Sequence, residues 1–215
     1  PSNSTIRRNL ISKPLAWMTQ SWTVKNLVEF KNAQDVLVEG NTIEHNWAAG
    51  QAGYSILVTP RNQSGSAPWS VTRNITIRSN VIRSVAAVFN VSGWDDLHLA
   101  LQTQNIAVEN NLVYDVSTAY NIPNPPANGW FAVIGNAPKN VTFSHNTVDH
   151  NGSNLIRLYS GKATDGVTKL CGVELPDHSG RDKTYGLSGE RPAQGTDDHT
   201  SFSTGASIRG TFFDD

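Results

Sequence analysis

The sequence predicts an all-β solenoid, a single domain over residues 1–215 that winds into about seven stacked coils. The first observation is a short pattern, apolar-x-apolar-x-x-Asn-x-apolar, that recurs along the chain at a spacing of about 33 residues. The second is that short apolar stretches alternate with polar residues, while helical periodicity is nearly absent. Strands this short cannot bury an apolar face alone, so the coils must stack on one another.

The pattern is clearest in five segments whose asparagines align. The segments are residues 4–12, 36–46, 75–85, 106–116 and 140–152, and the aligned residues are Asn9, Asn41, Asn80, Asn111 and Asn146. Successive asparagines are 32, 39, 31 and 35 residues apart. A nearly constant step of this kind assigns each segment to the next coil of the solenoid.

Beyond Asn146 the apolar pattern continues without the asparagine. His178 holds its place in residues 173–180, and Thr211 holds it in residues 206–215, after steps of 32 and then 33 residues. Gly, Asp, Thr and Ser replace many of the periodic apolar residues over 161–215. We therefore expect more irregular coils in this C-terminal part.

The recurrent asparagine needs a physical reason, because its short amide competes with the backbone for hydrogen bonds and is disfavoured in ordinary strands. In a right-handed parallel β-helix, equivalent residues of successive coils lie about one strand spacing, roughly 4.8 Å, apart. At that distance asparagines in a tight bend bond to one another and to the backbone, forming a ladder that satisfies polar groups turned inward. Leucine-rich and helical repeats do not fit, because neither their leucine spacing nor a 3.6-residue period is present.

These segments resemble the right-handed parallel β-helix repeat family, the pectate lyase-like superfamily that also contains polygalacturonases, other polysaccharide lyases and phage tailspikes. The resemblance implies three strands in each coil, with the ladder asparagine in the bend between the second and third. It further implies that the remaining strand floors a substrate groove, and it favours an extracellular or periplasmic protein. It does not transfer catalytic residues, because only an Asp-Asp element of the polygalacturonase signature is present, in an unmatched setting.

The floor strands are expected about 8 to 22 residues after each asparagine, where apolar runs occur at 26–32, 54–60, 87–93, 130–136, 154–161 and, weakly, 184–190. Aligning their inward residues leaves two outward rows. One row reads Glu29, Leu57, Asn90, Val133, Arg157 and Gly186, and the other reads Lys31, Thr59, Ser92, Gly135, Tyr159 and Ser188.

Loops that follow these strands carry Arg61 and the pair Asp95 and Asp96 on neighbouring coils, where all three are expected to project near one another. Two reactions fit these residue types. Glycoside hydrolysis needs two carboxylates, which Asp95, Asp96 and Glu29 offer. A β-eliminating lyase needs cations to neutralise a uronate and a base to remove its α-proton. The candidates for the second reaction are Lys31, Arg61, Arg157, Tyr159 and His98.

The sequence therefore predicts a carbohydrate-active protein that binds a polysaccharide or oligosaccharide, with Asp95, Asp96 and Arg61 as catalytic candidates. Residues expected to bind substrate are Glu29, Lys31, Asn90, Trp94, Trp130, Arg157 and Tyr159. No metal site or cofactor is predicted, and calcium is expected only if the chain is a lyase. The two histidines His45 and His150 hold one position of the repeat and are read as structural.

The alternative from another class is a non-catalytic β-helix module that binds glycans or builds a cell-surface or appendage scaffold. In that interpretation the Asp-Asp pair is a solvated turn, and the charged outward residues are surface groups. Under either interpretation, the loss of the asparagine pattern after Asn146 and the start within a coil suggest part of something longer, or a fragment whose open coil end makes an end-to-end or oligomeric contact.

Composition excludes several other classes. A formal net charge of -1, with 16% charged residues, leaves no basic surface for nucleic acid or an anionic membrane. No apolar run in the sequence reaches the about 18 residues that a membrane span needs. The single Cys171 excludes an intrachain disulfide and a Cys-based zinc site. The N-terminal residues lack the basic-then-apolar pattern of a signal peptide, so composition leaves the compartment open.

Overall fold

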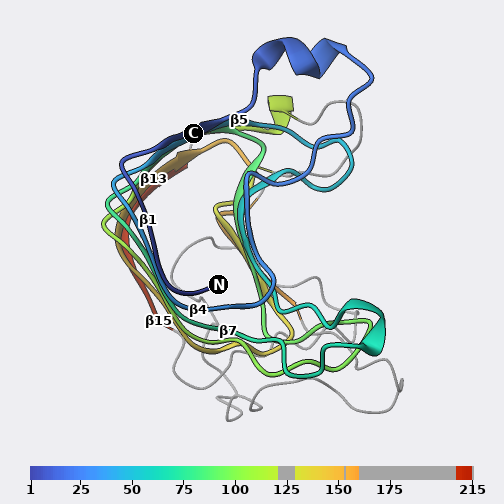
Figure 1. Ribbon diagram of the computed structural model, residues 1–215. Coiled ribbons are helices and arrows are strands. Elements are labelled where there is room, and N and C mark those ends of the chain that lie inside the picture. Colours follow the sequence, from blue (N-terminus) through green and yellow to red (C-terminus); the bar gives the residue numbers. More distant parts are fainter. Residues whose placement is uncertain (121–128, 153, 160–206, 215) are drawn as a thin grey trace, which may run out of the picture.

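The computed structural model describes residues 1–120, 129–152, 154–159 and 207–214, with Tyr159 and residues 207–214 described by their backbone alone (Figure 1). Regular structure in these residues is almost entirely β-strand. The exceptions are three short 3-10 helices, η1 Leu15–Thr19, η2 Gln63–Gly65 and η3 Thr118–Tyr120.

The larger of two sheets has ten strands and bends along its longest strand, β13 Lys139–His150. One group pairs with the first half of β13 and comprises β1 Ser2–Arg7, β4 Ala33–Glu39, β7 Thr72–Arg78 and β10 Gln104–Glu109. Another pairs with its second half and comprises β2 Leu10–Ser12, β5 Thr42–Asn46, β8 Val81–Val85 and β11 Leu112–Val116. The sheet therefore supplies two sides of a winding chain.

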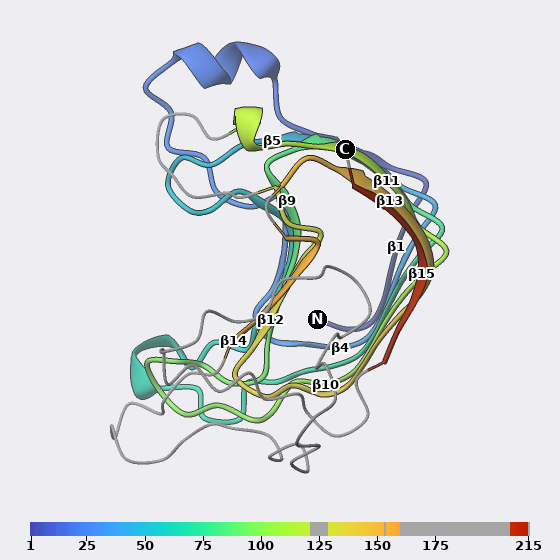
Figure 2. The same cartoon turned by 180° about the vertical axis from the view of Figure 1, so that it is seen from behind.

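A five-stranded sheet supplies the third side. Its strands are β3 Val28–Phe30, β6 Tyr54–Val58, β9 Ala87–Ser92, β12 Ala132–Gly135 and β14 Ile156–Tyr159. Every strand pair in both sheets is parallel, and pairing joins strands from successive windings. Figures 1 and 2 show the windings stacked behind one another along a common axis. The prediction of an all-β parallel solenoid is confirmed.

The last described strand, β15 Ser207–Asp214, corrects the expected order of the C-terminal coils. It pairs directly with β13, where the sequence pattern predicts the coil of residues 173–180. The register also shifts along this pair, so that Gly210 lies opposite Asn146 and Thr211 lies opposite Thr147. An apolar pattern without the asparagine does not fix the register of this segment. Residues 160–206, including His178 and the expected irregular coils, lie outside the described residues.

The core lies inside the windings and is built from equivalent residues of successive coils. Val38, Ile77, Val108 and Phe143 stack in one such row, and all four are fully buried. Phe143 also meets Phe131 from the opposite side of the core, with ring centroids 5.5 Å apart in an edge-on arrangement. Alternation of inward apolar and outward polar residues thus produces one continuous apolar interior.

Five asparagines form a row at the bend between the two groups of the larger sheet, and all but the terminal Asn9 are buried. The side-chain amide of each donates to Oδ1 of the next, from Asn9 to Asn41 at 3.1 Å and onward to Asn80, Asn111 and Asn146 at 2.9 Å in each step. The same Oδ1 atoms accept the backbone N–H of the preceding asparagine. Every inward amide between the ends is therefore satisfied by its neighbours. We call these five residues the asparagine row.

A second row of side chains, which sequence analysis missed, lies on the outside of the windings. Each of its members precedes a residue of the asparagine row by six positions in the sequence. The amides of Asn140, Asn105 and Asn74 donate in turn to Asn105, Asn74 and Asp35 at 2.8 to 3.0 Å. All four residues have φ between 53° and 57°, the left-handed region that Asn and Asp tolerate best among residues with a Cβ. The abundance of Asn therefore has two causes, internal hydrogen bonding and backbone turns.

Replacement of Asn80 by Ala is expected to lower the free energy of unfolding by about 1 to 3 kcal/mol, because it removes a buried amide bonded on both sides. The residue accepts two bonds from Asn41 and donates to Val38 and Asn111. Asn9→Ala is the matched control, since Asn9 is exposed and lies at the end of the row. Urea denaturation measures both variants, and an equal loss in the two would contradict the role given to the row.

Candidate functional site

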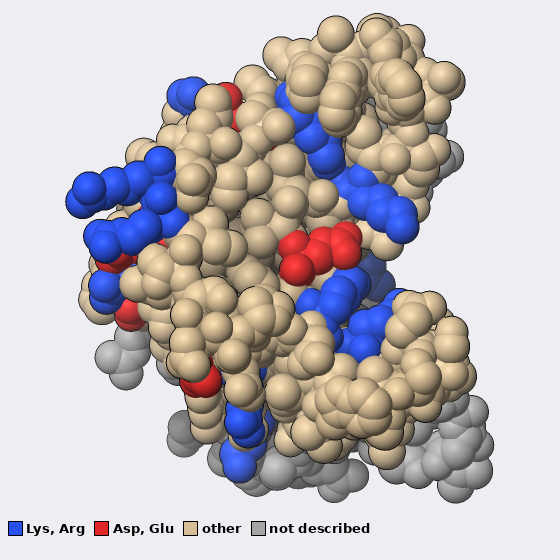
Figure 3. Space-filling view, in the orientation of Figure 1, with Lys and Arg blue, Asp and Glu red and all other residues tan. Residues whose placement is uncertain are grey.

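The outward face of the five-stranded sheet forms the floor of a groove between two sets of loops. The segments at 13–27 and 47–53 precede floor strands, and those at 59–71 and 93–103 follow them, projecting on the same side of the sheet (Figures 1 and 2). Figure 3 shows acidic and basic side chains close together in the hollow between these two sets of loops. The groove encloses a cavity of about 330 Å³.

Residues from both sets of loops and from the floor strands line this cavity. We call the cavity and the groove around it the floor groove. They are Asn26, Lys31, Gln51, Ala52, Tyr54, Leu57, Thr59, Pro60, Arg61, Asn90, Ser92, Trp94, Asp96 and Asn136. Five of them, Lys31, Arg61, Asn90, Trp94 and Asp96, are site residues that the sequence predicts. Amides, hydroxyls, cations, a carboxylate and aromatic rings are thus gathered in one hollow.

The register of the floor strands agrees with the sequence alignment. Glu29 lies beside Leu57, Leu57 beside Asn90, Asn90 beside Val133, and Val133 beside Arg157. In the second outward row, Ser92 lies beside Gly135, and Gly135 lies beside Tyr159. Gly186 and Ser188, the expected continuations of the two rows, fall outside the described residues.

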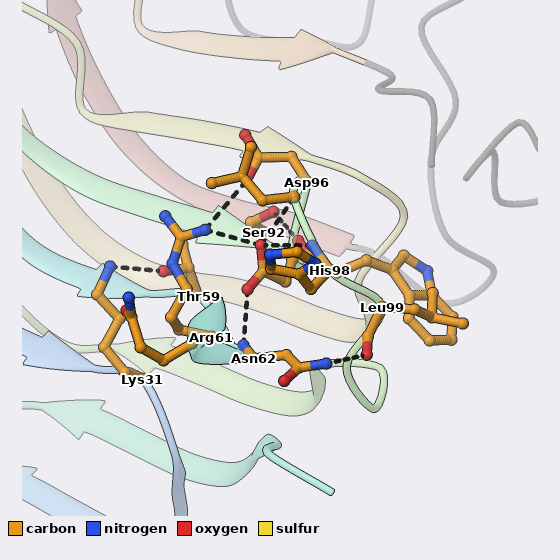
Figure 4. Close-up of polar contacts among 12 residues, drawn as sticks. Lys31, Thr59, Arg61, Asn62, Ser92, Asp96, His98 and Leu99 are labelled. Atoms are coloured by element: carbon orange, nitrogen blue, oxygen red, sulfur yellow. Dashed lines mark hydrogen bonds and ion pairs between the residues drawn. The ribbon is translucent and has the colours of Figure 1, made fainter. Parts of the chain in front are cut away.

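Lys31 follows β3 and points along the floor of the groove toward the next coil (Figure 4). Its Nζ donates to Thr59 Oγ1 at 3.1 Å and lies 3.9 Å from Glu29 Oε2. Burial lowers the pKa of Lys31 from its ordinary value, and the nearby Arg61 cation lowers it further against the opposing charges of Glu29, Asp95 and Asp96. A half-buried amine with a lowered pKa is a group that can lose its proton and act as a base.

Arg61 extends from the loop after β6 toward the next coil, where the loop after β9 carries both aspartates. Its Nη1 lies 2.7 Å from Asp95 Oδ1 and 3.8 Å from Asp96 Oδ1 (Figure 4). The predicted proximity of these three residues is therefore confirmed.

The two aspartates nevertheless differ in surroundings, which corrects the expectation that both project from an exposed loop. The Asp95 side chain is fully buried and accepts hydrogen bonds from Arg61 Nη1 and from the backbone N–H groups of Asn62 and Leu97 at 2.6 to 2.9 Å. The Asp96 side chain is 69% exposed and lines the floor groove. A short polar side chain in a loop can tie backbone groups together, and the sequence alone does not distinguish that role from exposure.

Asn62 completes the link between these two loops. Its Nδ2 donates to the Leu99 carbonyl at 2.9 Å, and its Oδ1 accepts the Ala67 N–H at 2.6 Å. Together with Asp95 it bonds the loop after β6 to the loop after β9. Asp95 therefore positions Arg61 and the two loops, after β6 and after β9, that form one wall of the groove. Asp96 remains available to a ligand.

Other predicted binding residues lie at or beyond the rim of the floor groove. Trp94 is partly exposed and lines the groove, whereas Trp130 is only 5% exposed and stacks beneath the Arg157 guanidinium at 5.1 Å. Trp130 is thus not free to stack on a sugar in this arrangement. Glu29 is held by Asn26, whose Nδ2 donates to its Oε1 at 2.7 Å. The Tyr159 side chain is outside what the structure describes.

Sequence analysis missed several residues that line the groove. Asn26 and Gln51 come from loops of unequal length, so no fixed position in the repeat indicates them. The two side chains are bonded to each other at 2.7 Å. Asn136 directly follows β12, two residues after the inward Ile134, so strand alternation assigns it to the core and gives no signal of a place in the groove.

The histidines and acidic residues of the described part of the chain do not cluster. No group of three or more His, Cys, Asp or Glu side chains among them is arranged to hold a metal ion. His45 Nδ1 lies 3.0 Å from Ser12 Oγ, and His150 is buried. None of the helices in the described part of the chain is long and apolar enough to cross a membrane.

Comparisons with protein-family models, curated proteins and solved structures found no match.

Asp95→Asn is expected to lower the free energy of unfolding by about 2 to 4 kcal/mol, because it leaves buried donors and Arg61 without their charged acceptor. Asp96→Asn should change it by no more than about 0.5 kcal/mol, since its side chain is exposed. Denaturant titration of the two variants at neutral pH measures the difference. Equal stability of both variants would show that the Asp95 contacts do not hold the loops.

Proposed function

We propose that the chain is a right-handed parallel β-helix with an asparagine ladder, and that its floor groove binds a polysaccharide chain. The observation that carries this proposal is the composition of the groove. Side-chain amides of Asn26, Gln51 and Asn90 lie beside hydroxyl groups and the aromatic ring of Trp94 in one open hollow. Amides and hydroxyls exchange hydrogen bonds with sugar hydroxyls, and aromatic rings pack against the apolar faces of sugar rings.

Of the reactions open to such a site, β-elimination of a uronate-containing polysaccharide has the best support. Arg61 supplies a permanent cation that would pair with the uronate carboxylate, and Lys31 supplies an amine with a lowered pKa. Neutral Lys31 would take the proton next to the carboxylate. The electron pair would form a carbon–carbon double bond as the bond to the leaving oxygen breaks, and that oxygen would take a proton from solvent.

Hydrolysis is a weaker candidate for this groove, because the buried Asp95 is fully engaged in holding the loops. It would have to use Asp96 with Glu29, the other carboxylates that the described residues place at this groove. A binding module without catalysis is the second candidate. It is favoured by the pairing of each cation with a carboxylate, Lys31 with Glu29 and Arg61 with Asp95, since a cation that is already paired is less available to a substrate carboxylate.

A panel of polysaccharides separates these functions. Polygalacturonate, alginate, xylan, mannan and cellulose oligomers are incubated with the protein, and products are followed by reducing ends and by ultraviolet absorbance of unsaturated uronates. We expect absorbance and reducing ends to rise together on a uronate polymer. Reducing ends without absorbance would indicate a hydrolase, and binding without either product would indicate the module. Absence of binding to every polymer would contradict the proposal.

The role of Lys31 predicts a pH dependence. A base must be neutral, and burial lowers the pKa of Lys31 from its usual 10.5, so turnover should rise with pH and the midpoint of that rise should lie below 10.5. Lys31→Arg keeps the charge but removes the base, and it should lower turnover by roughly 100-fold or more. Lys139→Arg, at an exposed position of β13 outside the groove, is the matched control and should retain the elimination activity. A Lys31→Arg variant with unchanged turnover and pH profile would exclude Lys31 as the base.

A further inference from the structure

Asn90 occupies an unusual position for an amide. It points outward from the middle of β9, where its cross-strand neighbours are Leu57 on one side and Val133 on the other. An apolar residue would pack better between two apolar side chains, and Asn is among the residues least suited to a strand interior. A residue that breaks a local rule in this way is most often retained for function.

The side chain of Asn90 also lacks hydrogen bonds within the described residues. Its Oδ1 is buried and has no partner there, and no described residue bonds to its Nδ2. Exchanging the oxygen and nitrogen of the amide would not change this result, because neither end is bonded. Buried polar atoms in folded proteins are satisfied in the great majority of cases, so this amide requires a partner that the described chain does not provide.

Asn136 carries a second unpaired oxygen in the same groove. The residue is 2% exposed, and its Nδ2 donates to Ser92 Oγ at 3.0 Å, while its Oδ1 has no partner among the described residues. The Ser92 hydroxyl in turn donates to the Trp94 carbonyl at 2.9 Å. This chain fixes the amide, so the acceptor of Asn136 is held in place by the wall of the groove.

The geometry points to a hydroxyl-recognising subsite in which Asn90 and Asn136 accept hydrogen bonds from unsubstituted sugar hydroxyl groups. This inference rests on the proposed polysaccharide function, and it specifies that the hydroxyl groups of the bound sugar are unsubstituted. Asn90 and Asn136, whose Oδ1 acceptors are buried and unpaired among the described residues, line the same hollow as Lys31 and Arg61, so the site complements a sugar that carries both free hydroxyls and acceptor oxygens. An O-acetylated sugar has no hydrogen to donate at the blocked position and leaves the buried acceptors unpaired, which is a strong ground for rejection.

Asn90→Leu tests the subsite, because it should lower the affinity for the ligand without lowering the stability of the protein. The amide makes no bond to the described residues, so its loss between Leu57 and Val133 should leave the melting temperature unchanged or raised. The affinity for the oligosaccharide should fall about 10-fold, as expected for a lost hydrogen bond to a ligand. Thr76→Leu is the matched control, because Thr76 lies between Leu37 and Ala107 on the outward face of the other sheet.

The measurement is calorimetric titration of wild type, Asn90→Leu and Thr76→Leu with native and chemically O-acetylated oligosaccharides of galacturonate, xylose, mannose and glucose. We expect wild type and Thr76→Leu to prefer an unsubstituted oligosaccharide, and Asn90→Leu to lose the preference. Equal affinity of wild type and Asn90→Leu, no wild-type preference against acetylation, or a lowered melting temperature in Asn90→Leu would overturn the subsite alone. Failure of wild type to bind any oligosaccharide would overturn the proposed function and the subsite together.

Discussion

The whole structure depends on one constraint: a polar group turned inward in a parallel solenoid has no water to bond and must be satisfied by the coil above or below. The asparagine row meets this constraint, because each amide donates to the next and each Oδ1 accepts both side-chain and backbone donors. Displacing one coil by a single residue would break these bonds and also turn the apolar residues outward. The row therefore fixes the register of the strands that flank its five residues.

A fixed register creates the groove from residues that are far apart in sequence. It sets Glu29, Leu57 and Asn90 side by side on the floor, although they come from three coils. The loops that follow the floor strands must then meet one another, and the buried Asp95 joins them while holding Arg61. The groups at the groove are thus held by paired strands and by hydrogen bonds between loops, which favours recognition because less order must be gained on binding.

The sequence was sufficient for those features that repeat. The asparagine spacing predicted the parallel fold, and the inward apolar residues predicted which floor residues would be neighbours, from Glu29 to Arg157. It could not predict the burial of Asp95 or of Trp130, because these depend on loops that differ in length from coil to coil. The position of β15 against β13 was missed for a related reason, since that segment lacks the asparagine that defines the register elsewhere. Periodic positions carry information on contacts, whereas loops must be folded before their contacts are known.

We propose above that the outward face of the five-stranded sheet binds carbohydrate. A crystal structure of the protein with the tightest-binding oligosaccharide tests it most directly. We expect the sugar to lie across β6 and β9, within hydrogen-bond distance of Asn90 and of Lys31 or Arg61. Ordered sugar bound on the larger sheet, with the floor groove empty, would contradict the claim.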